Sequence, residues 1–226
     1  MSGARLDTAD STGPAGTAGT AVRDLYWKPW DAPGCEHVRV TLKSETGDGA
    51  DAEVLAADAE VLVADGLVLL YRDGRALRCH YRLAADALWR ARALDLAVQS
   101  GGAALEERSL SLRGDGAGRW RVDGKRAAEL DGCLDLDIQV TPFTNTLPIR
   151  RLGLAAGEIA DIRAVYVPLP ELAPRPAEQS YACLRPLGLS GGLYRYESRA
   201  SGFGADLPVD SGGFVVDYPD SFRRIW

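Results

Sequence analysis

The sequence has few of the residues that carry metal, nucleophilic or redox chemistry. Its 226 residues include two histidines, one methionine and four cysteines, and the cysteines (Cys35, Cys79, Cys133 and Cys183) lie about fifty residues apart. No Cys-x-x-Cys pair is present, and Cys35 with His37 offers too few ligands for zinc. The glycine signatures of phosphate loops and dinucleotide sites are also missing. We therefore expect no metal, no cofactor and four free thiols that are buried.

The sequence also lacks a basic block and a long apolar run. Lys and Arg number 26 against 32 Asp and Glu, so the net charge is −6 and the pI is near 5.0. Such a chain is a poor match for nucleic acid or anionic lipid surfaces. No apolar run approaches the roughly 18 residues of a membrane-spanning helix, and residues 1–21 have no signal-peptide core. We expect no nucleic-acid partner, no integral membrane segment and a cytoplasmic location, while the oligomeric state stays open.

Turn residues between short alternating runs are what the sequence has in quantity. Six Asp-Gly pairs, including Asp65-Gly66, and three Gly-Gly pairs are typical of tight hairpin turns. Between them, residues 77–83 alternate apolar and polar side chains with a period of two, which indicates a half-buried strand. Comparable strands are expected at residues 50–64, 94–99, 109–113, 164–169, 179–184, 193–198, 203–209 and 213–217.

These runs predict an all-β protein with a single large antiparallel sheet of about 11–13 strands. A sheet of this size must curl, because long open edges invite aggregation, so we expect a half-open β-roll or barrel with an apolar hollow unless side chains fill it. One or two short helical turns are expected, including one at residues 220–226 that would plug an opening. Residues 1–20 are predicted to be a disordered N-terminal tail, and residues 21–226 a single domain.

Residues 133–154 combine a strand, a polar bend and a short helix. Apolar and polar residues alternate from 134 to 140, and Pro148 and Gly153 suit the first turn and the C-terminal stop of a helix. Asp135 and Asp137 share one face of the strand about 7 Å apart, and we expect them to face solvent. The polar residues 144–146 are expected to cap the helix, although they would also suit a sugar.

Several stretches of the sequence form a distinctive set: DGAGRWRVDG at residues 115–124, LDGCLDLD at 130–137 and TPFTNTLPIRRL at 141–152, with LWRAR at 88–92, YRYES at 194–198 and VDYP at 216–219. Together they resemble the bacterial glycolipid-binding protein family. The resemblance covers about residues 25–225. It implies a fold similar to the lipoprotein-carrier proteins, in which a curled antiparallel sheet surrounds an apolar hollow. It carries over no catalytic residues.

Taken together, these features favour a non-catalytic binder of a glycolipid or another amphiphile, with acyl chains in the hollow and the headgroup at a polar rim. Two alternatives stay open: an enzyme that acts on a lipid or glycan with Asp135 or Asp137 as acid/base, and a structural or interaction domain with a filled core. An internal ion pair is the competing role for Arg150 or Arg151, and core packing for the aromatic residues. The candidate rim residues are Trp89, Arg90, Arg92, Asp135, Asp137, Thr144, Asn145, Thr146, Arg150, Arg151, Tyr194 and Tyr196.

Overall fold

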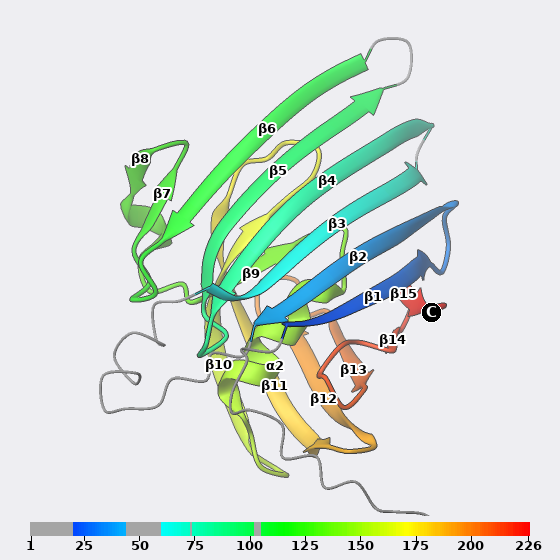
Figure 1. The fold of residues 1–226 in the computed structure, drawn as a ribbon, viewed down its shortest axis with the longest axis vertical. Helices are drawn as coiled ribbons and strands as arrows, with labels where there is room; N and C mark the ends of the chain where they lie inside the picture. The colour runs from blue at the N-terminus through cyan, green and yellow to red at the C-terminus, as the bar shows by residue number, and fades with distance from the viewer. Residues whose placement is uncertain (1–19, 44–59, 73, 102–104) are drawn as a thin grey trace, which may run out of the picture.

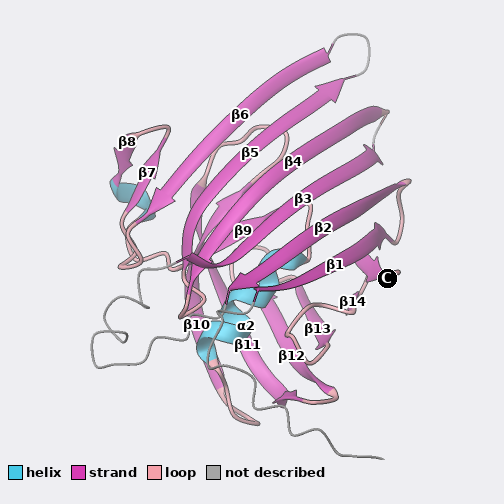
Figure 2. Ribbon diagram, in the orientation of Figure 1, coloured by secondary structure: helices cyan, strands magenta, loops and turns pink. Residues whose placement is uncertain are grey.

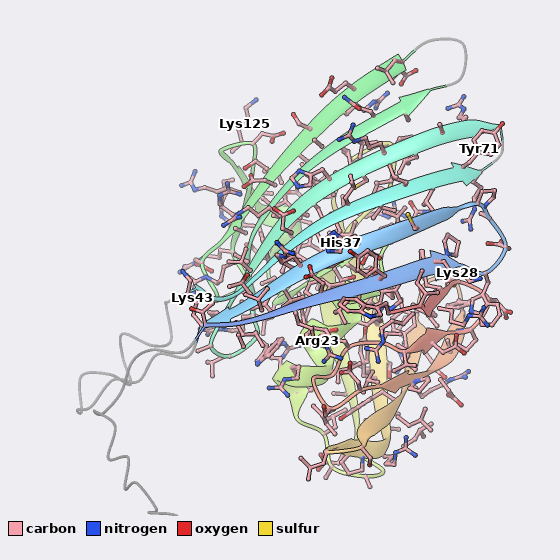
Figure 3. All side chains as sticks on the ribbon, turned by 45° about the vertical axis from the view of Figure 1, so that its right-hand side comes forward. Arg23, Lys28, His37, Lys43, Tyr71 and Lys125 are labelled. Carbon is pink, nitrogen blue, oxygen red and sulfur yellow. The ribbon has the colours of Figure 1, made fainter. Side chains whose placement is uncertain are left out.

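The computed structural model describes residues 20–43, 60–72, 74–101 and 105–226. Within them the chain forms fifteen strands, two short 3-10 helices and one α-helix (Figure 1). Figure 2 shows how completely strands dominate the fold. The predicted all-β class, with a large curled antiparallel sheet and short helical turns, is confirmed. The predicted tail, apart from Thr20, and residues 50–59 of the predicted strand 50–64 lie outside the described residues.

Ten strands form the first sheet, sheet A, which is antiparallel throughout and has the order β14-β15-β1-β2-β3-β4-β5-β6-β7-β8. Successive strands from β1 to β8 pair as neighbours, and Gly74, between β3 and β4, has the positive φ of 76° that suits a tight hairpin turn. Its strands are β1 (Thr20–Pro29), β2 (Gly34–Lys43), β3 (Glu60–Arg72), β4 (Arg75–Asp86), β5 (Ala91–Gly101), β6 (Leu105–Gly114), β7 (Trp120–Val122), β8 (Lys125–Ala127), β14 (Asp217–Tyr218) and β15 (Phe222–Arg224).

Five strands form sheet B, in the order β13-β12-β11-β10-β9. They are β9 (Asp135–Ile138), β10 (Ile159–Val167), β11 (Arg175–Gly188), β12 (Gly191–Ser198) and β13 (Gly204–Val209). The division into two sheets differs from the single sheet expected from the turn pattern. It arises because β9 does not pair with β8 but lies parallel to β10, and parallel neighbours need a long crossover.

That crossover contains η2 (Phe143–Asn145) and α2 (Thr146–Leu152), while η1 (Ala128–Leu130) precedes β9. The predicted stop is confirmed, because Gly153 ends α2 with a left-handed φ of 55°. One apolar core joins the inner face of sheet A to β9, β10 and the crossover, and it includes Trp27, Tyr81 and Phe143. A second core lies between the other face of sheet B and α2 and includes Ile149 and Tyr194.

Two local predictions are wrong for identifiable reasons. Gly66 does not form a turn but lies inside β3, where a Cβ atom would approach the Tyr81 ring to 2.2 Å. The glycine is needed there for close packing rather than for chain reversal. The predicted helical turn at residues 220–226 is instead strand β15, which pairs with β1 through Trp27–Arg224 and Pro29–Phe222.

Candidate functional site

A hollow with an apolar wall lies at the hairpin-tip end of sheet A. In an antiparallel meander, the β1–β2, β3–β4 and β5–β6 connections all fall at the same end, at the right of the sheet in Figure 1. A hollow of about 410 Å³ opens there. Sheet A forms one side of it, the segments that follow β9 and β10 form another, and the turn before β15 forms a third.

Apolar side chains line the inside of this hollow and charged ones surround its mouth. The apolar wall contains Leu70, Leu77, Val140, Leu169 and Phe222, and the polar lining contains Asp31, Arg72, Arg75, Ser100, Gln139, Asp220 and Ser221. Arg72 donates to Asp31 over 2.9 Å across the mouth, and both side chains are more than half exposed. The lining therefore has the division into apolar and charged parts that an amphiphile requires.

Away from the hollow, large side chains fill the interior of sheet A. Trp27, Tyr81 and Trp120 are at most 1% exposed. The indole nitrogens of Trp27 and Trp120 donate to the carbonyls of Val215 and Cys133, which fixes both rings in place. The interior of sheet A beside these three rings is therefore filled by side chains.

A buried carboxyl group lies on β2, further from the hairpin tips than the hollow. Glu36 is 1% exposed, and its register partner Val68 lies two residues beyond Leu70 of the hollow wall. The Tyr81 hydroxyl donates to Glu36 Oε1 over 2.7 Å and lies 3.4 Å from the Thr141 hydroxyl, while Glu36 Oε2 has no partner among the described residues. Burial raises the pKa of Glu36 to about 8, so this side chain carries a proton at neutral pH.

The structure gathers nine of the twelve predicted rim residues into three groups, of which the first surrounds the β4–β5 turn. The Arg150 guanidinium lies 4.6 Å from the Trp89 ring centre, which is cation–π geometry. Arg90 and Arg92 both reach Oδ2 of Asp86, at 2.8 and 3.3 Å, and the Asp86 side chain is fully buried. This group closes the turn around one buried acid.

The second group is the pair formed by Asp135 and Arg151. Asp135 is 1% exposed, so the expectation that it faces solvent is wrong: α2 packs over this face of β9 and covers it. Arg151 binds it in bidentate fashion, with Nε 3.0 Å from Oδ1 and Nη2 2.6 Å from Oδ2. Burial raises the pKa of Asp135, and Arg151 opposes that shift. Both oxygens are engaged, which argues against Asp135 as a catalytic base.

Thr144, Asn145 and Thr146 lie at the start of α2 and are buried. They do not cap the helix, because Asn145, the N-cap residue, makes no side-chain capping bond and the preceding turn η2 runs straight into α2. Asn145 Oδ1 instead accepts a 2.8 Å hydrogen bond from the Tyr181 hydroxyl, which ties the crossover to β11. The Thr144 and Thr146 hydroxyls have no partner among the described residues.

The third group lies on the same face of sheet B, beyond the end of α2. Asp137 is half-buried, and its Oδ2 accepts a 2.6 Å hydrogen bond from Gln179 Nε2. Burial raises the pKa of Asp137 to about 6. Tyr194 and Tyr196 follow on β12, where both are buried and the Tyr194 hydroxyl accepts the Leu187 N–H.

None of the twelve candidate residues lies in the lining of the hollow, so their role as its rim stays a prediction. Sequence reasoning missed the residues that do surround the mouth, Asp31, Arg72, Arg75 and Asp220. Each lies in or beside a turn between strands, and charged turn residues give no signal that distinguishes a mouth from ordinary solvent exposure. Only Gln139 and Val140, at the end of the predicted central strand, connect the two regions.

The described residues form neither a metal-binding cluster nor a membrane-spanning helix. No cluster of three or more His, Cys, Asp or Glu side chains within them has the geometry to hold a metal ion. No helix in the same ranges is long and apolar enough to cross a membrane. The four thiols are free, but Cys35 is exposed, so the expectation of burial holds for Cys79, Cys133 and Cys183 only.

Comparison with known proteins assigns the chain to a family. The family described as "Putative glycolipid-binding" matches residues 41–224. The chain belongs to this family. A crystal structure of a DUF1089 family protein from Pseudomonas aeruginosa is 34% identical, covers 98% of this chain and 100% of its own, and has a TM-score of 0.65. A β-barrel-like protein of the DUF1849 domain from Brucella abortus is 10% identical over 92% of this chain and 94% of its own, with a TM-score of 0.46. No curated protein sequence matches.

Proposed function

We propose that the protein binds a glycolipid or a similar amphiphile non-catalytically, with the acyl chain in the hollow and the polar part at its mouth. The observation that carries the proposal is the hollow of about 410 Å³, with Leu70, Leu77 and Phe222 in its wall and charged side chains at its opening. Its volume falls within the range of roughly 300–1,000 Å³ that small-molecule sites occupy. The family description supports the same class of ligand.

The expected affinity is modest. Each methylene that enters an apolar site contributes about 0.8 kcal/mol, so roughly ten of them give about 8 kcal/mol before costs. Association and the ordering of a flexible chain take back several kcal/mol, which leaves affinity in the micromolar range or weaker. Such affinity suits a carrier or sensor that exchanges its ligand.

Native mass spectrometry of the purified protein tests the proposal. We expect a bound lipid mass, either co-purified or after addition of n-octyl β-D-glucoside. Ser100 is a small residue in the lining of the hollow, so Ser100→Phe should fill the space and abolish the adduct. Ser109 lies exposed on the neighbouring strand β6, so Ser109→Phe is the matched control and should retain the adduct.

Two results would overturn the proposal. One is a wild-type protein that shows no adduct in either preparation. The other is an adduct that survives in folded Ser100→Phe as strongly as in the control, because the ligand would then lie elsewhere on the molecule.

A further inference from the structure

Four tyrosines surround Asp137 on the face of sheet B beyond α2. Tyr166 is its direct register partner on β10, and Tyr181 and Tyr196 face each other across β11 and β12 with ring centres 5.4 Å apart. Tyr218 of β14 meets Tyr196 edge-on at 6.2 Å. Burial raises the pKa of all four phenols, and the negative charge of Asp137 adds to the shift of each. We call Asp137, Gln179 and these four residues the tyrosine cluster.

The tyrosine cluster retains unused hydrogen-bonding capacity at its accessible edge. Asp137 Oδ2 accepts from the neutral amide of Gln179, and no arginine or lysine of the described residues pairs with this carboxyl group. The hydroxyls of Tyr166 and Tyr218 make no hydrogen bond to a described residue, and both residues are partly exposed. A phenol can donate and accept, and a carboxylate accepts from up to four donors, so the edge offers both kinds of group.

Three separate chain segments continue from the tyrosine cluster to residues that line the hollow. Gln139 follows Asp137 by two residues, in the turn after β9, and lines the hollow. Tyr166 is followed three residues later by Leu169 of the hollow wall. Tyr218 is followed by Asp220 and Ser221 at the mouth, in a turn closed by the Ser221 N–H on the Tyr218 carbonyl.

We propose that the tyrosine cluster is the headgroup subsite of the hollow and binds an uncharged, hydroxyl-rich group, that is, a glycosyl unit. This inference rests on the proposed function, because it places the headgroup of the ligand whose chain enters the hollow. The C–H face of a sugar ring packs against the exposed ring surface of Tyr166 and Tyr218. The sugar hydroxyls donate to Asp137 and exchange hydrogen bonds with the two free phenols.

A cationic headgroup fits this cluster less well than a sugar, although aromatic rings beside a carboxylate can hold ammonium groups. The Arg175 guanidinium already lies 4.9 Å from the centre of the Tyr166 ring. It occupies one face of that ring and adds a positive charge next to the subsite. A second cation would be repelled by Arg175, whereas a neutral polyol would not.

Three probes with the same eight-carbon chain test the inference by isothermal titration calorimetry. They are n-octyl β-D-glucoside, 1-octanol and octyltrimethylammonium. We expect Asp137→Asn to weaken glucoside binding about tenfold and Tyr218→Phe about threefold, with octanol binding unchanged in both, because only the glucoside uses these groups. Ser100→Phe should weaken all three probes alike, since they share the chain.

The outcomes separate the two proposals. If glucoside and octanol both bind and neither variant distinguishes them, the subsite is overturned while the hollow stands. If octyltrimethylammonium binds more tightly than the glucoside and loses affinity in Asp137→Asn, the cluster is a cation site and the sugar assignment is wrong. If no probe binds to the wild-type protein, both proposals fail together. Melting temperatures of Asp137→Asn and Tyr218→Phe that are no lower than that of the wild type show that the readout concerns binding.

Discussion

Buried carboxyl groups occur in two contrasting settings in this molecule. Around α2 and the β4–β5 turn, Asp135 and Asp86 are held by arginines at 2.6–3.3 Å. Towards the hairpin-tip end, Glu36 and Asp137 have neutral partners, a tyrosine hydroxyl and a glutamine amide. The hollow lies in the second region, next to residues that continue from Asp137.

This difference separates structural acids from acids that respond to their surroundings. A carboxylate with a bidentate arginine keeps its charge and fixes the geometry of the elements it joins. A buried carboxyl group with neutral partners instead changes its protonation near neutral pH, because nothing offsets the loss of hydration. The first kind holds the crossover in place, and the second kind makes the other region sensitive to pH and to ligand chemistry.

The largest effect should follow from breaking the Asp135–Arg151 pair. Arg151→Met leaves a buried carboxylate without a cation, and we expect a loss of about 4 kcal/mol in the free energy of unfolding, measured by urea denaturation at pH 7. Arg119→Met removes an arginine from an exposed pair with Asp115, and it should cost less than about 1 kcal/mol. Equal losses in the two variants would remove the distinction between buried and exposed pairs.

The double variant Asp135→Leu with Arg151→Met tests whether the loss in Arg151→Met comes from the unpaired buried charge. It removes both charges together and leaves no unpaired group, so most of the stability lost in Arg151→Met should return. A double variant as unstable as the single one would mean that Arg151 stabilises α2 by packing rather than by its charge.

The second largest effect should be the pH dependence of protein stability that Glu36 causes. Its pKa is raised from 4.5 to about 8 in the folded protein, so the folded state keeps a proton that the unfolded state releases. The stability that this group contributes is therefore fully present below about pH 4.5 and is lost as the pH rises towards 8. Between pH 5 and pH 7, the wild type should lose about 2.5 kcal/mol relative to Glu36→Gln.

Urea denaturation of both proteins at several pH values measures this difference. Gln has nearly the same shape as Glu and does not titrate, so the curve of the variant should be flatter by that amount. Parallel curves for wild type and variant would show that Glu36 ionises normally, and the contrast with Asp135 would then disappear.

The smallest effect should come from Asp137, whose pKa is raised from 3.8 to about 6. As with Glu36, the stability that Asp137 contributes decreases as the pH rises. The decrease occurs at lower pH, between about pH 4 and pH 6. Since Asp137 is partly accessible to solvent, we expect a loss of only about 1 kcal/mol relative to Asp137→Asn. Chemical shifts of the Asp137 carboxyl carbon during a pH titration measure the midpoint directly, and a midpoint near 4 would contradict this assignment.

Much of the fold could be predicted from the sequence because its strands are amphipathic and its turns are marked. Residues 77–83 alternate as β4 does in the structure, with Cys79 and Tyr81 buried and His80 exposed. The Arg151–Asp135 pair could also be predicted from the sequence, since two arginines and two aspartates lie in one short segment. Local periodicity and charge matching suffice for features of this kind.

Other features depend on contacts between residues far apart in the sequence. In the sequence, Gly66 has the pattern of a turn residue, and only its contact with the Tyr81 ring explains why a glycine is needed there. The burial of Asp135 depends on where α2 packs. The hollow is formed by residues of β3, β4, β5 and β15 and of the turns beside β1, β9 and β10, none of which is unusual in its own sequence window. The position of a cavity is a property of packing, which periodicity does not encode.

The parallel pairing of β9 with β10 also restricts how the length of the chain can vary. A hairpin turn can gain or lose residues while its two strands keep their directions, but parallel neighbours need a connection that travels back along the whole strand. Between Gln139 and Glu158, a deletion that shortened this return to a tight turn would reverse the direction of β9. Insertions and deletions should therefore be tolerated at the hairpin tips of sheet A and selected against in this one connection.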